Sequence, residues 1–228
     1  MSFGADPIPR SELLLRMQGE NGDVIPPGSF LFIAERFDLI QEIDRWVVSR
    51  AIEILSEEQA AGREVVLCVN LSAKSVVDPA LPAHIAGELK AHGADGRGLC
   101  FEVTETAAVV NIDRARHFAS VVAELGCEFA LDDFGAGFAS FYYLKHLAFD
   151  LLKIDGEFVT DLTTSRTNQL VVKAVVDIAR GLGKRTIAEF VEDEATLQVC
   201  RRHGVDFAQG NYVGHPVPVD LMLEAARA

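Results

Sequence analysis

Two adjacent carboxylates, Asp132 and Asp133, directly follow the apolar run at 129–131. Neighbouring carboxylates repel each other, so one of them is normally protonated unless a cation lies between them. The pair therefore indicates a bound metal ion or an acid with a perturbed pKa. A structural alternative is a helix cap, because aspartate before a glycine-rich turn often accepts backbone N–H bonds. A second apolar run ends in a similar way, on Lys153 and Asp155.

Polar and charged residues stand at the ends of the other predicted strands too. In a parallel barrel these ends meet at one rim, where uncompensated carboxylates would cost several kcal/mol. Oxygen ligands without histidine or cysteine select hard divalent cations, namely Mg²⁺, Mn²⁺ or Ca²⁺. The strand-end residues are Glu12, Arg16, Asn70, Glu102, Glu105, Asp132, Asp133, Lys153, Glu189, Glu192 and Gln209.

Such a rim suits hydrolysis of a phosphodiester, because two metal ions a few ångströms apart favour in-line attack by water. Lys153 would orient or polarise the water, and Arg16 would hold a phosphate. Lys153 also has a structural alternative, an ion pair with Asp150 or Asp155. The chain has no Gly-x-Ser-x-Gly or Ser/His/Asp pattern, which argues against acyl transfer.

Four other candidates have structural alternatives or roles. Glu12 could be a surface charge at the edge of a strand, and Asn70 could cap the following helix. Glu105 and Glu192 lie beyond their strand ends, so we expect them to fix loops rather than bind metal.

The elements that would position these residues alternate between strand and helix. The strands are continuous apolar runs, which is typical of parallel sheets buried under helices, and the alternation predicts a β/α barrel. Seven strands are found where a complete barrel has eight, and only residues 1–10 precede the first. The strands are predicted at 11–16, 65–71, 99–103, 128–132, 150–154, 185–189 and 205–208, and the helices at 29–58, 75–91, 113–125, 168–181, 194–203 and 219–227, with a short one before 146.

Composition bounds the class of protein. With 228 residues, 49% of them hydrophobic, the chain fits one large domain. The net charge of −13 argues against bulk nucleic-acid binding but is compatible with a small phosphorylated ligand if metal ions mask the carboxylates. No apolar run reaches the length of a membrane span, so we expect a cytoplasmic protein. The four cysteines show no CxxC pairing and are interpreted as buried, reduced thiols.

Seven motifs between residue 11 and about residue 218 carry a family resemblance. They are Glu12-Leu13-Leu14 with Arg16, Val69-Asn70-Leu71-Ser72, Phe101-Glu102-Val103-Thr104-Glu105, Asp132-Asp133-Phe134-Gly135, Leu152-Lys153-Ile154-Asp155, Ala188-Glu189-Phe190-Val191-Glu192 and Ala208-Gln209-Gly210.

In order and spacing these motifs resemble the EAL domain, the family of cyclic di-GMP phosphodiesterases. The resemblance implies a modified TIM-type (β/α)8 barrel over 11–228, with its first strand missing or replaced by an irregular segment at 1–10. It also implies hydrolysis of one phosphodiester bond of cyclic di-GMP to linear pGpG by a metal-activated water. Family members work as homodimers, usually beside sensory or cyclase domains.

The resemblance assigns roles by position. Two ions, Mg²⁺ or Mn²⁺, are implied, and we expect Ca²⁺ to bind there and inhibit, because its looser geometry suits binding better than in-line chemistry. Lys153 resembles the residue that positions the water, and Glu105 the one that holds the loop at 134–143, which links the active site to the dimer interface. The implied metal ligands are Glu12, Asn70, Glu102, Asp132, Asp133 and Glu189, of which Glu12, Asp132 and Glu189 act in catalysis with Lys153, and the substrate contacts are Arg16, Gln209 and Asp133.

Three features depart from the family pattern. The signature reads Glu-Leu-Leu, and Leu13 should face away from the metal ions. Phe190 stands where the family often has glycine, and the upstream strand with its Gln-Pro pair is absent. The alternatives to an active phosphodiesterase are a weak or inactive cyclic di-GMP receptor, a regulatory scaffold that binds proteins, and an unrelated metal-dependent barrel enzyme such as a lyase acting on enolates.

Overall fold

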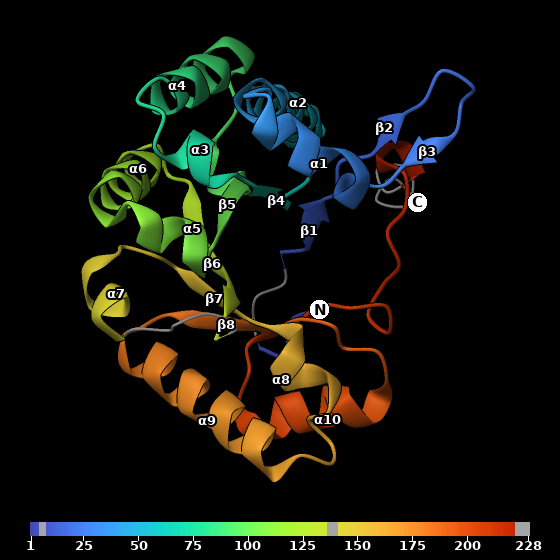
Figure 1. Cartoon of the computed structure of the whole chain (residues 1–228), viewed down its shortest axis with the longest axis vertical. Helices are drawn as coiled ribbons and strands as arrows, with labels where there is room; N and C mark the ends of the chain where they lie inside the picture. The colour runs from blue at the N-terminus through green and yellow to red at the C-terminus, as the bar shows by residue number, and fades with distance from the viewer. Residues whose placement is uncertain (5–7, 136–140, 222–228) are drawn as a thin grey trace.

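The computed structural model describes residues 1–4, 8–135 and 141–221, and shows a curved sheet with helices around it (Figure 1). Seven strands follow one another in the sheet in chain order, and every neighbouring pair is parallel. The predicted α/β, TIM-type architecture is confirmed. The strands are β1 (Arg10–Leu13), β4 (Val66–Asn70), β5 (Leu99–Thr104), β6 (Glu128–Phe134), β7 (Leu151–Ile154), β8 (Arg185–Ala188) and β9 (Phe207–Ala208).

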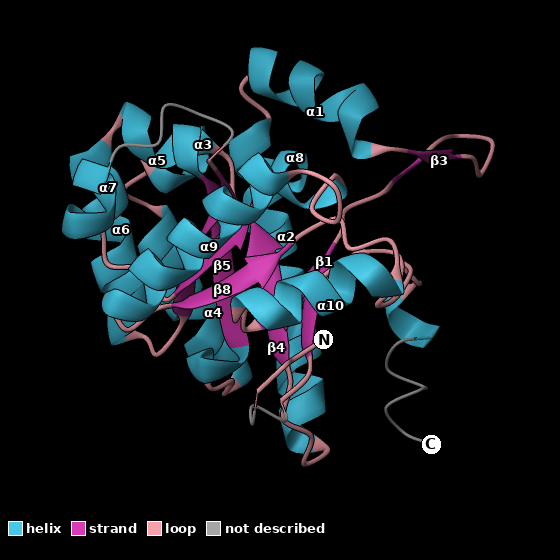
Figure 2. Ribbon diagram, turned by 90° about the horizontal axis from the view of Figure 1, so that it is seen from below, coloured by secondary structure: helices cyan, strands magenta, loops and turns pink. Residues whose placement is uncertain are grey.

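Helices cover the outer face of this sheet, so the strands lie inside a layer of helices in Figure 2. A small antiparallel hairpin of β2 (Met17–Gln18) and β3 (Val24–Ile25) projects from the body (Figures 1 and 2). Within the described residues, no helix is long and apolar enough to cross a membrane. The helices are α1 (Pro27–Arg36), α2 (Ile40–Ala60), α3 (Ala73–Val76), α4 (Leu81–His92), the 3-10 turn η1 (Gly96–Gly98), α5 (Glu105–Val110), α6 (Ile112–Glu124), α7 (Phe141–His146), α8 (Gly156–Thr160), α9 (Arg166–Gly181) and α10 (Glu194–His203).

The inner face of the sheet carries a separate small core. Successive residues of a strand point to opposite faces, so inner positions recur every second residue. Glu102 lies two residues beyond Cys100, and Lys153 lies two beyond Leu151, so both also belong to the inner face. They lie at the carboxyl ends of the strands, and this end of the barrel is called the rim. The amino ends are called the lower end. The inner core consists of Val66, Cys68, Cys100, Ala130, Leu151, Ile187 and Phe207.

The first residues of the chain lie against β9, on the edge that does not pair with β8. Ser2 forms an isolated antiparallel bridge with Phe207. The N–H of Phe3 donates to the carbonyl of Asp206 at 2.9 Å, and the carbonyl of Met1 accepts from the N–H of Ala208 at 2.8 Å. The segment at 1–10 therefore begins with backbone pairing to the sheet, and a domain boundary at residue 11 stays a prediction.

Some helices differ from the prediction. The helix predicted at 29–58 is divided into α1 and α2 because the chain turns at Asp38, whose φ of 57° is left-handed. The apolar pattern behind that prediction includes Phe32 and Trp46, which are 69% and 60% exposed. The helix predicted at 75–91 is likewise divided, into α3 and α4. The closing helix predicted at 219–227 lies outside the described residues from residue 222 onwards.

Candidate active site

Lys153 of β7 lies at the centre of the rim, with a side chain only 1% exposed. Its Nζ donates to Glu102 Oε2 at 2.7 Å and lies 3.0 Å from Asp132 Oδ1. Glu189 Oε1 is 2.9 Å away and Glu12 Oε2 is 3.8 Å away. Four strands thus direct carboxylates at one ammonium group, as the rim hypothesis predicts.

The structural alternative for Lys153, an ion pair with Asp150 or Asp155, does not match its contacts. Asp150 lies 3.8 Å from Lys184 Nζ. Asp155 caps α8 by accepting from the N–H of Glu157 at 2.6 Å. Among the described residues, the ion pairs of Lys153 all go to the rim carboxylates.

Negative charge exceeds positive charge at this site. Burial opposes protonation of Lys153, but Glu102, Asp132 and Glu189 outweigh it and raise the lysine's pKa, which favours its charged form. Burial raises the pKa of Glu102 to about 7 and that of Glu189 to about 8. Carboxyl groups with such raised pKa values gain from any added cation.

Glu12 is held from both sides of the gap between β1 and β9. Asn70 Nδ2 donates to Glu12 Oε1 at 2.5 Å, and Gln209 Nε2 donates to Glu12 Oε2. The side chain of Glu12 is only 15% exposed, so it is not a surface charge. Asn70 is not the helix cap either, because Ser72 caps α3 by accepting from the N–H of Ser75.

β6 is irregular where the two aspartates lie. Its register with β7 shifts between Leu131 and Phe134, and Asp133 has a φ of 51°. In a regular strand, adjacent side chains point to opposite faces. Here carboxylate oxygens of Asp132, Asp133 and Glu189 lie within 4.8 Å of one another. Burial, followed by the charge of Asp132, raises the pKa of Asp133.

These residues fit hard divalent cations. The cluster offers carboxylate oxygens and the Asn70 amide oxygen, and Lys153 is its only cation among the residues that the structure describes, so a surplus of negative charge remains there. Oxygen-rich sites of this kind bind Mg²⁺, Mn²⁺ or Ca²⁺. Two divalent cations, together with Lys153, would balance the charge of the four carboxylates around its ammonium group and of neighbouring Asp133.

The remaining candidates lie around this cluster. Glu105 is buried, which raises its pKa, and its Oε2 accepts from the N–H of Gly135 at 3.2 Å, at the start of the loop that it was expected to hold. Residues 136–140 of that loop lie outside the described residues. Glu192 is exposed and makes no hydrogen bond or ion pair with any described residue. Arg16 is exposed and donates to the carbonyl of Leu15 at 2.9 Å.

A cavity of about 750 Å³ runs along the gap between β1 and β9. The sequence analysis missed that the segment at 213–219 forms part of its wall, because the segment contains no paired acids. The available signal for a loop here was the presence of residues unsuited to a helix interior, namely Gly210, Pro216 and Pro218. Other lining residues are Arg16, Glu12 and Gln209 at the rim, Cys68 and Phe207 inside the barrel, and Arg10 at the lower end.

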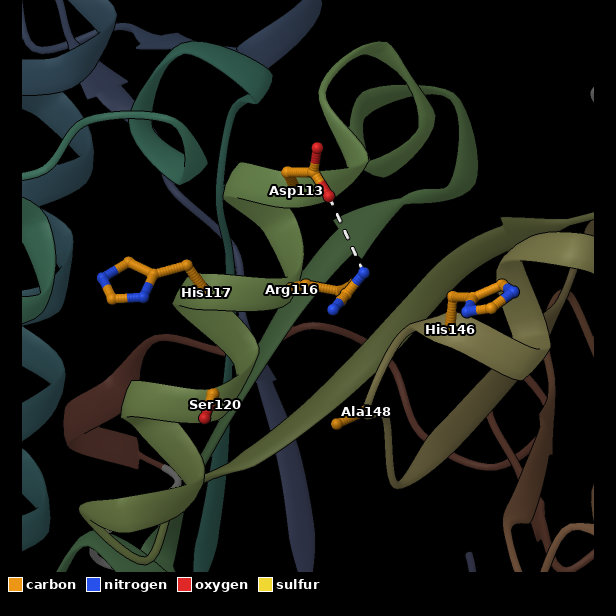
Figure 3. Close-up of a pocket in the computed structure, with 6 residues that line it drawn as sticks. All are labelled: Asp113, Arg116, His117, Ser120, His146 and Ala148. Atoms are coloured by element: carbon orange, nitrogen blue, oxygen red, sulfur yellow. Dashed lines mark ion pairs between the residues drawn. The ribbon is translucent and has the colours of Figure 1, made fainter.

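A second hollow, of about 420 Å³, lies outside the barrel between α6 and the segment that follows α7 (Figure 3). Its lining includes His117 and His146, together with Arg116, whose Nη1 lies 3.7 Å from Asp113 Oδ1. None of the rim residues lines it, so it is separate from the candidate active site.

The curled parallel sheet and its carboxylate rim define a barrel protein with a candidate site for divalent cations. Comparison with known families specifies it further. The model of the EAL domain matches residues 1–216, and the chain belongs to the EAL domain family. The family predicted from the motifs is confirmed.

The relatives include named phosphodiesterases. Cyclic di-GMP phosphodiesterase PdeB of Shewanella oneidensis is 37% identical over 94% of this chain and 25% of its own length. PdeF of Escherichia coli, which has the same descriptive name, is 36% identical over 93% of this chain and 29% of its own length. The chain thus spans about a quarter of the length of these relatives.

Solved structures agree with the fold. The FimX EAL domain of Xanthomonas citri, in complex with c-diGMP, has a TM-score of 0.89 and 33% identity, over 93% of this chain and 84% of that one. The PaMucR phosphodiesterase, in a c-di-GMP complex, has a TM-score of 0.87 and 32% identity, over 92% and 86%.

Proposed function

We propose that this chain hydrolyses one phosphodiester bond of cyclic di-GMP to linear pGpG in a metal-dependent reaction. The observation that carries the proposal is the convergence of rim carboxylates on buried Lys153 in a member of the EAL domain family. The names of PdeB and PdeF support the choice of substrate.

Six residues would hold two ions, Mg²⁺ or Mn²⁺. When bound, the ions would lower the pKa of a water molecule and neutralise phosphate oxygens. The rest of the chemistry belongs to the chain. Glu12 is already oriented by amide donors from β4 and β9. The proposed ligands are Glu12, Asn70, Glu102, Asp132, Asp133 and Glu189.

Lys153 would orient the water and stabilise negative charge as a permanent hydrogen-bond donor. In the metal-free site the surrounding carboxylates raise the pKa of Lys153, which favours its role as a donor. Arg16 and Gln209, which line the cavity, would contact the substrate together with Asp133. Glu105 would hold the loop that begins at Gly135 by accepting from the N–H of that glycine. A loop-fixing role of Glu192 stays a prediction, because Glu192 is exposed and bonds to no described residue.

Chromatography of the products tests the proposal. We expect linear pGpG from cyclic di-GMP with Mg²⁺ or Mn²⁺, none with EDTA, and at least about 100-fold less from Glu12→Ala, since removing one group from a charged catalytic site typically costs that much. Glu53→Gln, which removes an exposed carboxylate on α2, is the matched control and should retain activity. Equal turnover by Glu12→Ala and the parent chain would refute the assignment.

We also propose that Ca²⁺ binds the same oxygen ligands and inhibits. Ca²⁺ accepts more ligands at longer, looser distances than Mg²⁺, so it positions the reacting groups less well. Turnover in fixed Mg²⁺ should fall as Ca²⁺ is added and recover when Mg²⁺ is raised. Equal rates in Ca²⁺ and Mg²⁺ would contradict this.

A weak or inactive cyclic di-GMP receptor is the second candidate. The cavity between β1 and β9 favours it, because the gap leaves the wall beside Glu12 and Gln209 incomplete. Calorimetric binding of cyclic di-GMP without product in saturating Mg²⁺ or Mn²⁺ would establish this function. Absence of any nucleotide binding would instead favour a protein-binding scaffold.

We further propose that the domain forms a homodimer and works beside sensory or cyclase domains. The support is indirect: the relatives are about three to four times longer, and MucR of Pseudomonas aeruginosa is named a bifunctional diguanylate cyclase and phosphodiesterase. Light scattering after size-exclusion chromatography should give twice the chain mass of 24.8 kDa. A mass of one chain at micromolar concentration would contradict the dimer.

A further inference from the structure

Two cysteines face each other inside the barrel, one layer below the rim. Cys68 of β4 and Cys100 of β5 are partners in the register of adjacent parallel strands. Both are buried and belong to the inner core. Their sulfur atoms and a carboxylate oxygen of Glu102 lie within 4.8 Å of one another. Glu102 is therefore shared between the rim and this thiol pair.

The spacing suits one bridging ion. Zinc binds thiolate sulfur at about 2.3 Å and carboxylate oxygen at about 2.1 Å, so the ligand atoms of a tetrahedral zinc site lie about 3.6–3.8 Å apart. Small side-chain movements would bring Cys68, Cys100 and Glu102 to that separation. A disulfide fits less well, because it needs Cβ atoms about 3.8 Å apart, whereas parallel strands lie about 4.8 Å apart.

One of the two thiols borders a cavity. Cys68 lines the cavity of about 750 Å³ that runs along the gap between β1 and β9. The same cavity is lined by Glu12 and Gln209 at the rim. An ion in this cavity therefore meets oxygen ligands at the rim and Cys68 one layer below, with Cys100 buried behind it.

We propose that Cys68, Cys100 and Glu102 form a binding site for a thiophilic divalent cation, Zn²⁺ or Cd²⁺. Two thiolates and one carboxylate, with water in a fourth position, match the ligand types and the count of open zinc sites. Thiolates select such ions over Mg²⁺ and Ca²⁺, which prefer oxygen. Each thiol releases one proton to solvent as the ion binds.

Occupation of this site would affect the rim through Glu102. That carboxylate accepts from Lys153 at 2.7 Å and is among the proposed Mg²⁺ ligands. An ion between the sulfurs would draw Glu102 towards the middle of the barrel. The carboxylate would then move away from Lys153 and from the proposed Mg²⁺ site. Binding of Zn²⁺ or Cd²⁺ at this site should therefore inhibit turnover. The inhibition rests on the proposed phosphodiesterase function, whereas the binding of the ion does not.

Sequence motifs cannot reveal this pair. The cysteines belong to different strands, without the short spacing of a zinc motif, and only the register of β4 and β5 brings them together. The interpretation as buried, reduced thiols holds for the burial of all four cysteines. It does not distinguish this pair from Cys127 and Cys200, which lie in the outer core.

The test uses Cd²⁺, whose bonds to thiolates absorb in the ultraviolet, whereas its bonds to oxygen do not. Titration of the metal-free chain should give the absorption of two thiolates at one ion per chain. Cys68→Ser and Cys100→Ser should each raise the Kd for this signal at least tenfold. Cys127→Ser and Cys200→Ser, which remove equally buried thiols, are matched controls and should leave the Kd within twofold.

Equal effects of all four substitutions, or absence of the signal from the parent chain, would overturn the proposal. A measurement on the unaltered chain guards against variants that fail to fold. Its ¹¹³Cd resonance should fall in the range of mixed sulfur and oxygen ligands, and a resonance typical of oxygen ligands alone would also overturn it.

Activity separates this inference from the proposed function. Zn²⁺ at micromolar concentration should inhibit turnover by the parent chain in saturating Mg²⁺. In Cys68→Ser the same concentration should inhibit less, so the ratio of the rates with and without Zn²⁺ should be closer to one. Glu12→Ala should keep the thiolate signal of Cd²⁺ whether or not it is active. If no form of the chain turns over cyclic di-GMP, the Cd²⁺ titration still decides the thiol site.

Discussion

The two ends of the barrel carry ion clusters of opposite composition. At the rim, one ammonium group, Lys153, faces several carboxylates. At the lower end, one carboxylate, Glu128, lies between two guanidinium groups. Its Oε2 is 2.5 Å from Arg10 Nη1, and its Oε1 is 2.5 Å from Arg185 Nη2. The same barrel thus contains an acidic cluster and a basic one.

Three strands contribute to both clusters, so strand order alone does not make one of them a site. The lower cluster has one positive charge in excess, and the chain itself contacts both arginines: Glu128 accepts from both guanidinium groups, and the ring of Phe207 lies 5.1 Å from Arg10 and 5.6 Å from Arg185. The rim keeps a surplus of negative charge. The difference teaches that a large surplus of buried charge, rather than buried charge as such, marks the candidate site. The strand pairs are Arg10 and Glu12 on β1, Glu128 and Asp132 on β6, and Arg185 and Glu189 at β8.

Removal of the central cation should have the largest effect. Lys153→Met leaves buried carboxylates without a partner, so we expect the free energy of unfolding in EDTA to fall by about 3–5 kcal/mol. Mg²⁺ should restore part of it, because it supplies positive charge to the same oxygens, but activity should be lost. Denaturant unfolding with and without Mg²⁺ measures this.

Lys173→Met is the control for Lys153→Met. It breaks an exposed pair with Asp177 and should change stability by at most about 1 kcal/mol. If both substitutions had equally small effects in EDTA, the rim would not be short of positive charge, and the comparison of the two ends would fail.

The lower cluster should matter for stability and not for chemistry. Glu128→Gln leaves two guanidinium groups without their carboxylate. We expect a loss of about 2 kcal/mol, below the usual cost for a fully buried pair because Arg185 is 34% exposed and can turn towards water. Turnover per folded molecule should stay unchanged in saturating Mg²⁺. A variant that is fully stable but inactive would show that the lower end takes part in function.

Acid should weaken the lower cluster. Burial opposes ionisation of Glu128, but its bonds to Arg10 and the charges of Arg10 and Arg185 outweigh it and lower its pKa below the ordinary 4.5. A carboxylate with a lowered pKa stabilises the fold above its unfolded pKa and loses that contribution as the pH falls through the folded pKa.

The difference in unfolding free energy between the parent chain and Glu128→Gln should therefore be largest near neutral pH. It should shrink steadily as the pH falls below about 4.5. Parallel denaturant titrations across this range measure it. A difference that grows in acid would mean that Glu128 is not held ionised by the two arginines.

Backbone strain is also unevenly distributed, and relieving it should have the smallest effect. Among the described residues, three other than glycine have positive φ, and two of them, Asp133 and Phe190, lie at the rim. Phe190→Gly should change the free energy of unfolding by less than about 1 kcal/mol. Glycine relieves the backbone strain of the φ of 51°, but it adds flexibility to the unfolded chain and removes the ring that packs over Gly156, so the contributions largely cancel.

Phe32→Gly is the control for this substitution. Phe32 is similarly exposed but lies inside α1, where glycine should cost about 1 kcal/mol. Equal losses at the two positions, measured by denaturant unfolding, would show that the rim is not strained at Phe190.

Much of the fold and the set of rim residues could be predicted from the sequence. Parallel strands are buried on both faces, so each appears as an apolar run, and all seven runs are strands in the structure. Because every strand ends at the same rim, its last polar residue could be assigned there without knowledge of the packing. This reasoning placed Lys153, Glu102 and Glu189 in one site, and they are in contact.

Features that depend on register or on single backbone angles could not be predicted. The chain gives no local sign that Cys68 faces Cys100, or that Glu128 reaches two arginines from other strands. The position of Phe190 gave a partial signal, since the family often has glycine there and its φ is one that glycine adopts easily.

The irregularity of β6 has a consequence for protein design. Asp132 and Asp133 serve the same rim only because the strand changes register between them and its neighbour. A designer who grafts these side chains onto an idealised barrel would send one aspartate into the helix layer. The part that must be transferred is therefore the bent backbone together with its side chains. A scaffold without that bend would need it built in before the metal-binding side chains are placed.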